Sequence, residues 1–165
     1  QEASGIINGF LISKKTASLF SCCCSLGLIS SGNKKSKSVE DFGLFLGIIF
    51  QIKDDLFDYS QKRIGKPTKY EIKNQKITLP LIYSIKKDIN SEKRLIKSIL
   101  KRKKLTIKEK NKIYQFIIDN DGFYYAKNVM LNYKNKALKI LESFPDNESK
   151  QSLRILLDYI IDRKY

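Results

Sequence analysis

One segment limits the possible folds more than any other, because it is apolar on nearly every side of a helix yet carries three carboxylates at one end. Most positions over residues 42–57 are Phe, Leu or Ile, and Asp54, Asp55 and Asp58 close the segment. A helix that is apolar all round is expected to be buried. The sequence therefore predicts a buried helix over about residues 38–59, which other helices must surround.

Helical spacing recurs along the rest of the chain, whereas the alternating pattern of strands is scarce. We predict an all-α helical bundle that forms a single domain over residues 1–165. Turn-forming residues, Pro80 in a first turn and a capping box of Thr106 and Glu109 mark helix boundaries. The predicted helices cover about residues 4–29, 38–59, 78–87, 91–104, 106–122 and 123–143, with a last helix after Pro145 and a loop over 60–75.

The last helix has the clearest apolar stripe. Its members repeat at i, i+3, i+4, i+7 and i+8, and they are Leu153, Leu156, Leu157, Ile160 and Ile161. This spacing predicts that one face of the helix is buried.

The residue types present exclude several catalytic mechanisms. The chain has no histidine, which excludes serine–histidine and cysteine–histidine catalysis and makes zinc a poor candidate. The cysteines, Cys22, Cys23 and Cys24, are consecutive, so their side chains fan around a helix and cannot converge on one metal. We expect them to lie in a reduced helix of the core.

The net charge of +15 suits an anionic partner in principle. However, Lys, Ile and Asn are all heavily used, and AT-rich codons explain that composition without a polyanion. No helix combines basic residues with aromatic ones in a recognition pattern, so no nucleic-acid partner is expected.

The sequence does not predict a transmembrane segment. The longest unbroken apolar run covers residues 42–50, and a bilayer needs about 20 residues. Ser and Thr also interrupt residues 14–30, the stretch that resembles a signal peptide. We expect a cytoplasmic protein.

Four positions of the buried helix share one face: Gly47, Gln51, Asp54 and Asp58, with Asp55 about 100° to the side. Buried, unpaired carboxylates are costly, so a cation must face them. Lys53 precedes Asp54 and points away, which leaves a lysine from elsewhere or a metal. Oxygen ligands favour Mg²⁺, which completes its coordination with water and phosphate. The alternative is that these aspartates cap or solvate the end of a core helix, a position that the helix dipole disfavours.

Other polar residues could complete such a site. Lys66 and Lys76 lie in and just after the predicted loop, and Lys15 and Thr16 interrupt an otherwise apolar helix. Lysine suits phosphate oxygens as a point charge. Together these residues predict a cavity with magnesium ligands, cations for phosphate and apolar walls.

These motifs resemble the trans-isoprenyl diphosphate synthases, also called polyprenyl synthetases. The segment GIIFQIKDDLFDY, followed by GKPTKYEIKNQKITLPLIY, is similar to the second aspartate-rich motif of the family and its trailing elements. ISKKTASLF is similar to the upstream Lys-Thr element, and GFYYAKNVMLNYKNKAL and LRILLDYIIDRKY are similar to the closing helices. The resemblance covers the whole chain but only the C-terminal part of the family's length.

The resemblance implies an isoprenoid-synthase-type fold and the condensation of isopentenyl diphosphate with an allylic diphosphate. It places Mg²⁺ on Asp54, Asp55 and Asp58. It also places the allylic diphosphate near a second set of residues, namely Lys15, Thr16, Gln51, Lys66 and, less directly, Lys76. Asp54, Asp55 and Lys66 would be catalytic.

The sequence departs from the family pattern in two ways. Glu71 and Gln75 stand where the family commonly has Asp and Gly, and no other D-D-x-x-D motif occurs. We therefore expect a prenyltransferase part that has little or no activity without an N-terminal half, or that works beside a homodimer partner. The alternative is a non-catalytic diphosphate-binding or regulatory subunit, or a remnant of such a synthase.

Overall fold

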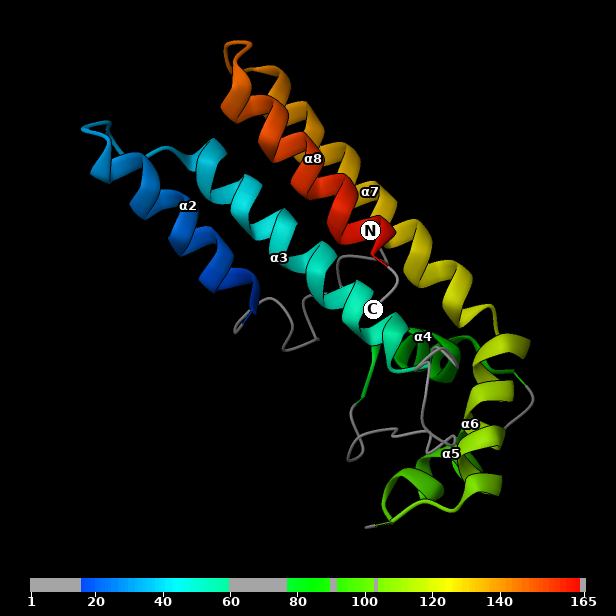
Figure 1. Cartoon of the computed structure of the whole chain (residues 1–165). Helices are drawn as coiled ribbons and strands as arrows, with labels where there is room; N and C mark the ends of the chain where they lie inside the picture. Colours follow the sequence, from blue (N-terminus) through cyan, green and yellow to red (C-terminus); the bar gives the residue numbers. More distant parts are fainter. Residues whose placement is uncertain (1–15, 60–76, 90–91, 103, 164–165) are drawn as a thin grey trace, which may run out of the picture. The chain divides into compact units, whose positions relative to one another are not determined.

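The computed structural model describes residues 16–59, 77–89, 92–102 and 104–163, and its regular elements are all helices (Figure 1). They are α2 (Ser18–Ser30), α3 (Lys37–Phe57), α4 (Leu79–Lys87), α5 (Glu92–Leu100), α6 (Ile107–Asp119), α7 (Gly122–Glu142) and α8 (Glu148–Asp162). The all-α prediction is confirmed, and where the predicted helices fall on described residues their bounds agree to within a few positions. The predicted loop over 60–75 lies outside the described residues.

The chain groups into two compact units. Among the described residues, one comprises 16–53 and 128–163, and the other comprises 54–59, 77–89, 92–102 and 104–127. Helices α3 and α7 each contribute residues to both units. The expectation of one domain over residues 1–165 stays a prediction.

In the first unit, two glycines let α2 lie directly on α3 (Figure 1). A Cβ atom added at Gly47 would lie 2.5 Å from the Cα of Ala17, and one added at Gly43 would lie 2.6 Å from the carbonyl oxygen of Phe20. Because any side chain would collide with backbone at both positions, only glycine permits this approach. Gly43 and Gly47 are one turn apart, so the contact extends along one face of α3.

The end of α8 contacts α3 in the same unit through a hydrogen bond and a cation–π contact. Lys53 donates a hydrogen bond to the carbonyl oxygen of Ile161, and the Arg163 guanidinium lies 4.3 Å from the centre of the Phe50 ring. A cation beside the last carbonyls of a helix is favourable because the helix dipole is negative there. The predicted stripe of α8 is partly confirmed, since Leu157 and Ile160 are buried whereas Leu156 is 39% exposed.

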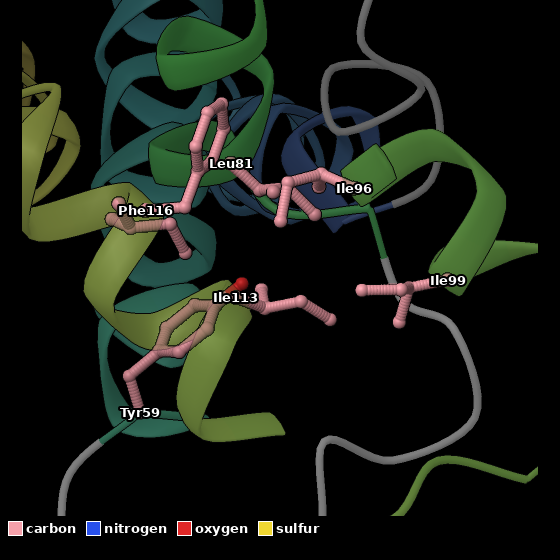
Figure 2. Close-up of a cluster of buried hydrophobic side chains, with 7 residues drawn as sticks. Tyr59, Leu81, Ile96, Ile99, Ile113 and Phe116 are labelled. Atoms are coloured by element: carbon pink, nitrogen blue, oxygen red, sulfur yellow. The ribbon is translucent and has the colours of Figure 1, made fainter. Parts of the chain in front are cut away.

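The second unit has its own hydrophobic core, to which Tyr59, two residues after α3, and helices α4, α5 and α6 contribute (Figure 2). Its buried members are Tyr59, Leu81, Ile96, Ile99, Ile113, Phe116 and Ile117. The predicted capping box begins α6: the Thr106 hydroxyl accepts from the Glu109 amide, and the Glu109 carboxylate accepts from the Thr106 amide.

Helix α2 differs from its predicted role as a core helix. None of its residues is buried, and Cys22 and Cys23 are exposed. The expectation of cysteines in the core is therefore wrong for Cys22 and Cys23, because the outer face of α2 meets no other described element, whereas Cys24 is half-buried. Among the described residues, no helix combines the length and apolar composition needed to cross a bilayer.

Candidate functional site

The three aspartates of the sequence motif end up in different environments. Asp54 lies in the last turn of α3 and Asp58 follows directly after the helix, and both are half-buried. The Asp58 amide donates to the Asp54 carbonyl oxygen at 3.1 Å, which continues the helical turn and keeps both residues on one face. Asp55, by contrast, is completely buried.

Asp55 binds the start of the next helix. Its Oδ2 atom accepts a hydrogen bond from the Leu79 amide at 3.1 Å, across a sequence separation of 24 residues. Leu79 is the first residue of α4, where backbone amides lack partners within the helix. The positive end of the α4 dipole thus faces the Asp55 carboxylate and compensates for its burial.

Thr78, the residue before Leu79, makes a second buried hydrogen bond. The hydroxyl groups of Tyr59 and Thr78 are 2.6 Å apart, and both residues are buried. Burial raises the pKa of the Tyr59 hydroxyl well above its usual range, so this group stays protonated. Thr78 has the extended backbone of an N-cap, as the sequence predicts, but its side chain makes no capping hydrogen bond. Its hydroxyl is paired with Tyr59 instead, and Asp55 supplies a carboxylate to the first turn of α4.

Thr16 and Gln51 meet in the first unit. The Thr16 hydroxyl donates to Gln51 Oε1 at 3.1 Å. The close approach of α2 at Gly47, one turn before Gln51, brings the two side chains together. Both were predicted to contact the same ligand, and the hydrogen bond fixes the orientation of the Gln51 carboxamide.

The basic residues of the predicted site are described only in part. Lys53 donates a hydrogen bond to the carbonyl oxygen of Ile161, and the expectation that it points away from the aspartates stays a prediction. Lys15, Lys66 and Lys76 lie outside the described residues.

The carboxylates can be tested as a metal site. Within the described ranges, no group of three or more Asp, Glu or Cys side chains is placed to hold a metal ion. Mg²⁺ is usually held by one or two carboxylates, and water and substrate phosphates fill its remaining positions. Asp54 and Asp58 fit that pattern, because they are half-buried and one helical turn apart.

Comparison with known proteins identifies the family. The sequence profile of the polyprenyl synthetases matches residues 9–117. The chain belongs to the polyprenyl synthetase family. The match includes the carboxylates at the end of α3 and extends through most of α6.

Several relatives and solved structures show how far the similarity extends. Heptaprenyl diphosphate synthase component 2 of Bacillus subtilis is 30% identical over 159 residues, which cover 93% of this chain and 44% of that protein. Geranylgeranyl diphosphate synthase of Saccharolobus solfataricus is 30% identical over 160 residues, which cover 93% of this chain and 48% of the relative. The crystal structure of a polyprenyl synthase from Caulobacter crescentus, complexed with calcium and isoprenyl diphosphate, has a TM-score of 0.79 and 29% identity. That match covers 94% of this chain and 48% of the crystallised one. This polyprenyl synthetase chain thus spans about half the length of the relatives that it matches.

The sequence did not predict two contacts in this chain. Neither the bond from Leu79 to Asp55 nor the pair formed by Tyr59 and Thr78 was predicted. A signal was present, because Thr78 and Pro80 mark the start of a helix whose first amide needs an acceptor. The chain alone did not indicate that the acceptor comes from the aspartate motif.

Proposed function

We propose that this chain is the part of a trans-polyprenyl diphosphate synthase that binds a magnesium-bound diphosphate. The reaction joins isopentenyl diphosphate to an allylic diphosphate. One observation carries the proposal: the chain belongs to the polyprenyl synthetases and ends α3 with two half-buried carboxylates on one face. The calcium and isoprenyl diphosphate bound by the Caulobacter crescentus relative support a divalent cation and a diphosphate ligand.

The polar side chains at the end of α3 have chemistry that suits metal and diphosphate binding. Asp54 and Asp58 would hold Mg²⁺, which supplies positive charge to a departing diphosphate. The sequence also predicts Asp55 as a ligand of this cation, and that role stays a prediction. Gln51, oriented by Thr16, would position the diphosphate.

Lysines and apolar surfaces complete the proposed chemistry. Lys15, Lys66 and Lys76 would neutralise the diphosphate oxygens. Apolar helix faces would keep water away from the allylic cation that forms when the diphosphate leaves. That cation is attacked by the double bond of isopentenyl diphosphate, and a proton is then lost.

The proposed synthase needs a second part. This chain spans about half of its relatives, and the relative from Bacillus subtilis is named as a component, which supports a partner subunit. Helix α2 has an exposed apolar face that includes Leu19, Leu26 and Ile29, whose side chains are 62%, 59% and 49% exposed. We assign this face to the N-terminal half of the synthase.

Two measurements test the proposed function. Calorimetric titration of the chain with inorganic pyrophosphate should show binding that requires Mg²⁺, and Asp54→Asn should weaken it about tenfold or more because a carboxylate ligand is lost. Prenyl transfer should appear when the N-terminal half of a homologous synthase is added with both substrates. A chain that neither binds pyrophosphate nor supports prenyl transfer would contradict the proposal.

A second candidate is a non-catalytic diphosphate-binding or regulatory subunit. Glu71 and Gln75, which stand where the family commonly has Asp and Gly, favour it because they alter the segment that follows the aspartate motif. The two candidates differ in the effect of Asp54→Ala on an assembled complex. The mutation should abolish turnover if this chain contributes to catalysis, and it should leave the partner's turnover unchanged if the chain only regulates.

A further inference from the structure

The aspartate motif contains one carboxylate whose environment differs from that of the other two. Asp55 is 0% exposed and its Oδ2 atom accepts from the first amide of α4, whereas Asp54 and Asp58 are half-buried. We propose that Asp55 is a positioning residue that locks the end of α3 onto the start of α4 and so holds Asp54 and Asp58 in place. This inference rests on the proposed function, which assigns the cation to Asp54 and Asp58.

The start of α4 depends on an outside acceptor. The Thr78 side chain makes no capping hydrogen bond to α4, and its hydroxyl is paired with Tyr59. Pro80 has no amide hydrogen, and the Ile82 amide is satisfied by the Thr78 carbonyl oxygen at 3.0 Å. The Leu79 amide is buried in this contact, and Asp55 accepts its hydrogen bond. A buried amide without an acceptor would be costly, so the contact favours one arrangement of α3 and α4.

The same contact restrains the site carboxylates. The last turn of a helix frays readily, and α3 ends at Phe57, between Asp54 and Asp58. Asp55 and Tyr59 flank this region, and both side chains are anchored on the α4 start, at Leu79 and Thr78. Because Asp55 adjoins Asp54 and Tyr59 adjoins Asp58, the two bonds fix the backbone from which the proposed metal ligands project.

The three aspartates of the motif therefore have two kinds of partner. The half-buried carboxylates are assigned to a cation and a diphosphate, and the buried carboxylate is bound to a helix N-terminus. On this proposal, a cation compensates the charges of Asp54 and Asp58, and the N-terminus of α4 compensates the charge of Asp55.

The test compares three variants of the full chain. Asp55→Asn keeps the shape of the side chain and one carbonyl acceptor, Asp55→Ala removes the acceptor, and Asp54→Asn alters the neighbouring carboxylate. Amide hydrogen exchange at Leu79 is measured without metal, and affinity for pyrophosphate is measured with Mg²⁺ by calorimetry.

We expect Asp55→Ala to raise the exchange rate at Leu79 about tenfold or more, because the amide loses its acceptor. Asp55→Asn should keep both exchange and pyrophosphate affinity within about threefold of the wild type, since a neutral carbonyl can still accept the hydrogen bond. Asp54→Asn should leave the exchange unchanged and weaken pyrophosphate binding about tenfold or more, as expected for a lost ligand.

Two outcomes would overturn the inference. One is an unchanged exchange rate at Leu79 in Asp55→Ala. The other is an Asp55→Asn chain whose affinity for pyrophosphate falls as far as that of Asp54→Asn while the exchange rate of the Leu79 amide stays unchanged. That result would make Asp55 a direct ligand of the cation. A wild-type chain that binds no pyrophosphate would instead overturn the proposed function, and the exchange measurement would still show whether Asp55 holds α4.

Discussion

At the scale of single residues, a buried carboxylate can be compensated by a metal, by a basic side chain or by the N-terminus of a helix. Among the described residues of the second unit, two buried aspartates accept hydrogen bonds from the N-termini of helices. Asp55 accepts from the first amide of α4, and Asp88, which is 4% exposed, accepts from the Lys93 amide in the first turn of α5 at 2.8 Å. Burial of an aspartate is thus insufficient to identify a metal ligand, and the partner of the carboxylate decides its role.

The pair formed by Tyr59 and Thr78 gives a prediction about stability. Replacing Tyr59 with Phe should lower the free energy of unfolding by about 1–3 kcal/mol, because the buried Thr78 hydroxyl loses its partner while the ring stays in the core. Equilibrium unfolding in urea measures this loss.

A double-mutant cycle supplies the control. Thr78→Val removes the other hydroxyl with little change of shape, and it should also destabilise the chain. The double mutant should lose less stability than the sum of the single mutants, since neither hydroxyl is then left buried without a partner. Strictly additive losses would show that the two hydroxyl groups are not energetically coupled.

Some residue-level features followed from helix geometry alone. The shared face of Asp54 and Asp58 required only the helical repeat of about 100° per residue, and the hydrogen bond from the Asp58 amide to the Asp54 carbonyl oxygen continues that repeat. The partner of Asp55 could not be predicted in this way. A helical repeat gives the direction of a side chain around its own axis, whereas the Leu79 amide reaches Asp55 only through tertiary folding.

At the scale of helices, the packing of α2 on α3 depends on two glycines. Gly47→Ala should destabilise the chain by about 1–3 kcal/mol, because the new methyl group would lie 2.5 Å from the Cα of Ala17 and the backbones must separate. The same separation should break the hydrogen bond from Thr16 to Gln51. Urea unfolding gives the stability, and Mg²⁺-dependent pyrophosphate binding reports on the pair.

Gly27 provides a matched control within α2. An added Cβ there would meet nothing within 4 Å, so Gly27→Ala should stabilise the chain by up to about 1 kcal/mol through helix propensity alone. If Gly47→Ala were equally stabilising, the close approach of α2 and α3 would be wrong.

The boundaries of the helices could be predicted because local chemistry sets them. The capping box of Thr106 and Glu109 and the proline in the first turn of α4 are recognisable within four residues of sequence. Burial could not be predicted so well. The cysteines and leucines of α2 look like core residues, but burial depends on a neighbouring element, and none of the described residues covers the outer face of α2.

At the scale of the whole molecule, this exposed face and the length of the chain point to one explanation. Leu19, Leu26 and Ile29 lie on one side of α2 at separations of seven and three residues, which is the spacing of a helix-packing stripe. The chain spans 44% and 48% of its relatives from Bacillus subtilis and Saccharolobus solfataricus. Under the proposed function, this apolar stripe is the surface that we assign to the N-terminal half of the synthase.

Leu26→Glu tests that assignment, with Ile155→Glu on α8 as the control because Ile155 is 68% exposed and Leu26 is 59% exposed. Both substitutions should change the stability of the isolated chain by no more than about 0.5 kcal/mol, as is usual for surface positions. Leu26→Glu should weaken binding of the N-terminal half of a homologous synthase about tenfold or more, since a charge would be buried at the interface. Ile155→Glu should leave that affinity nearly unchanged. Calorimetry measures the affinity, and light scattering shows whether the wild type pairs with a second copy instead. Equal binding by the wild type and Leu26→Glu would show that α2 does not receive the N-terminal half.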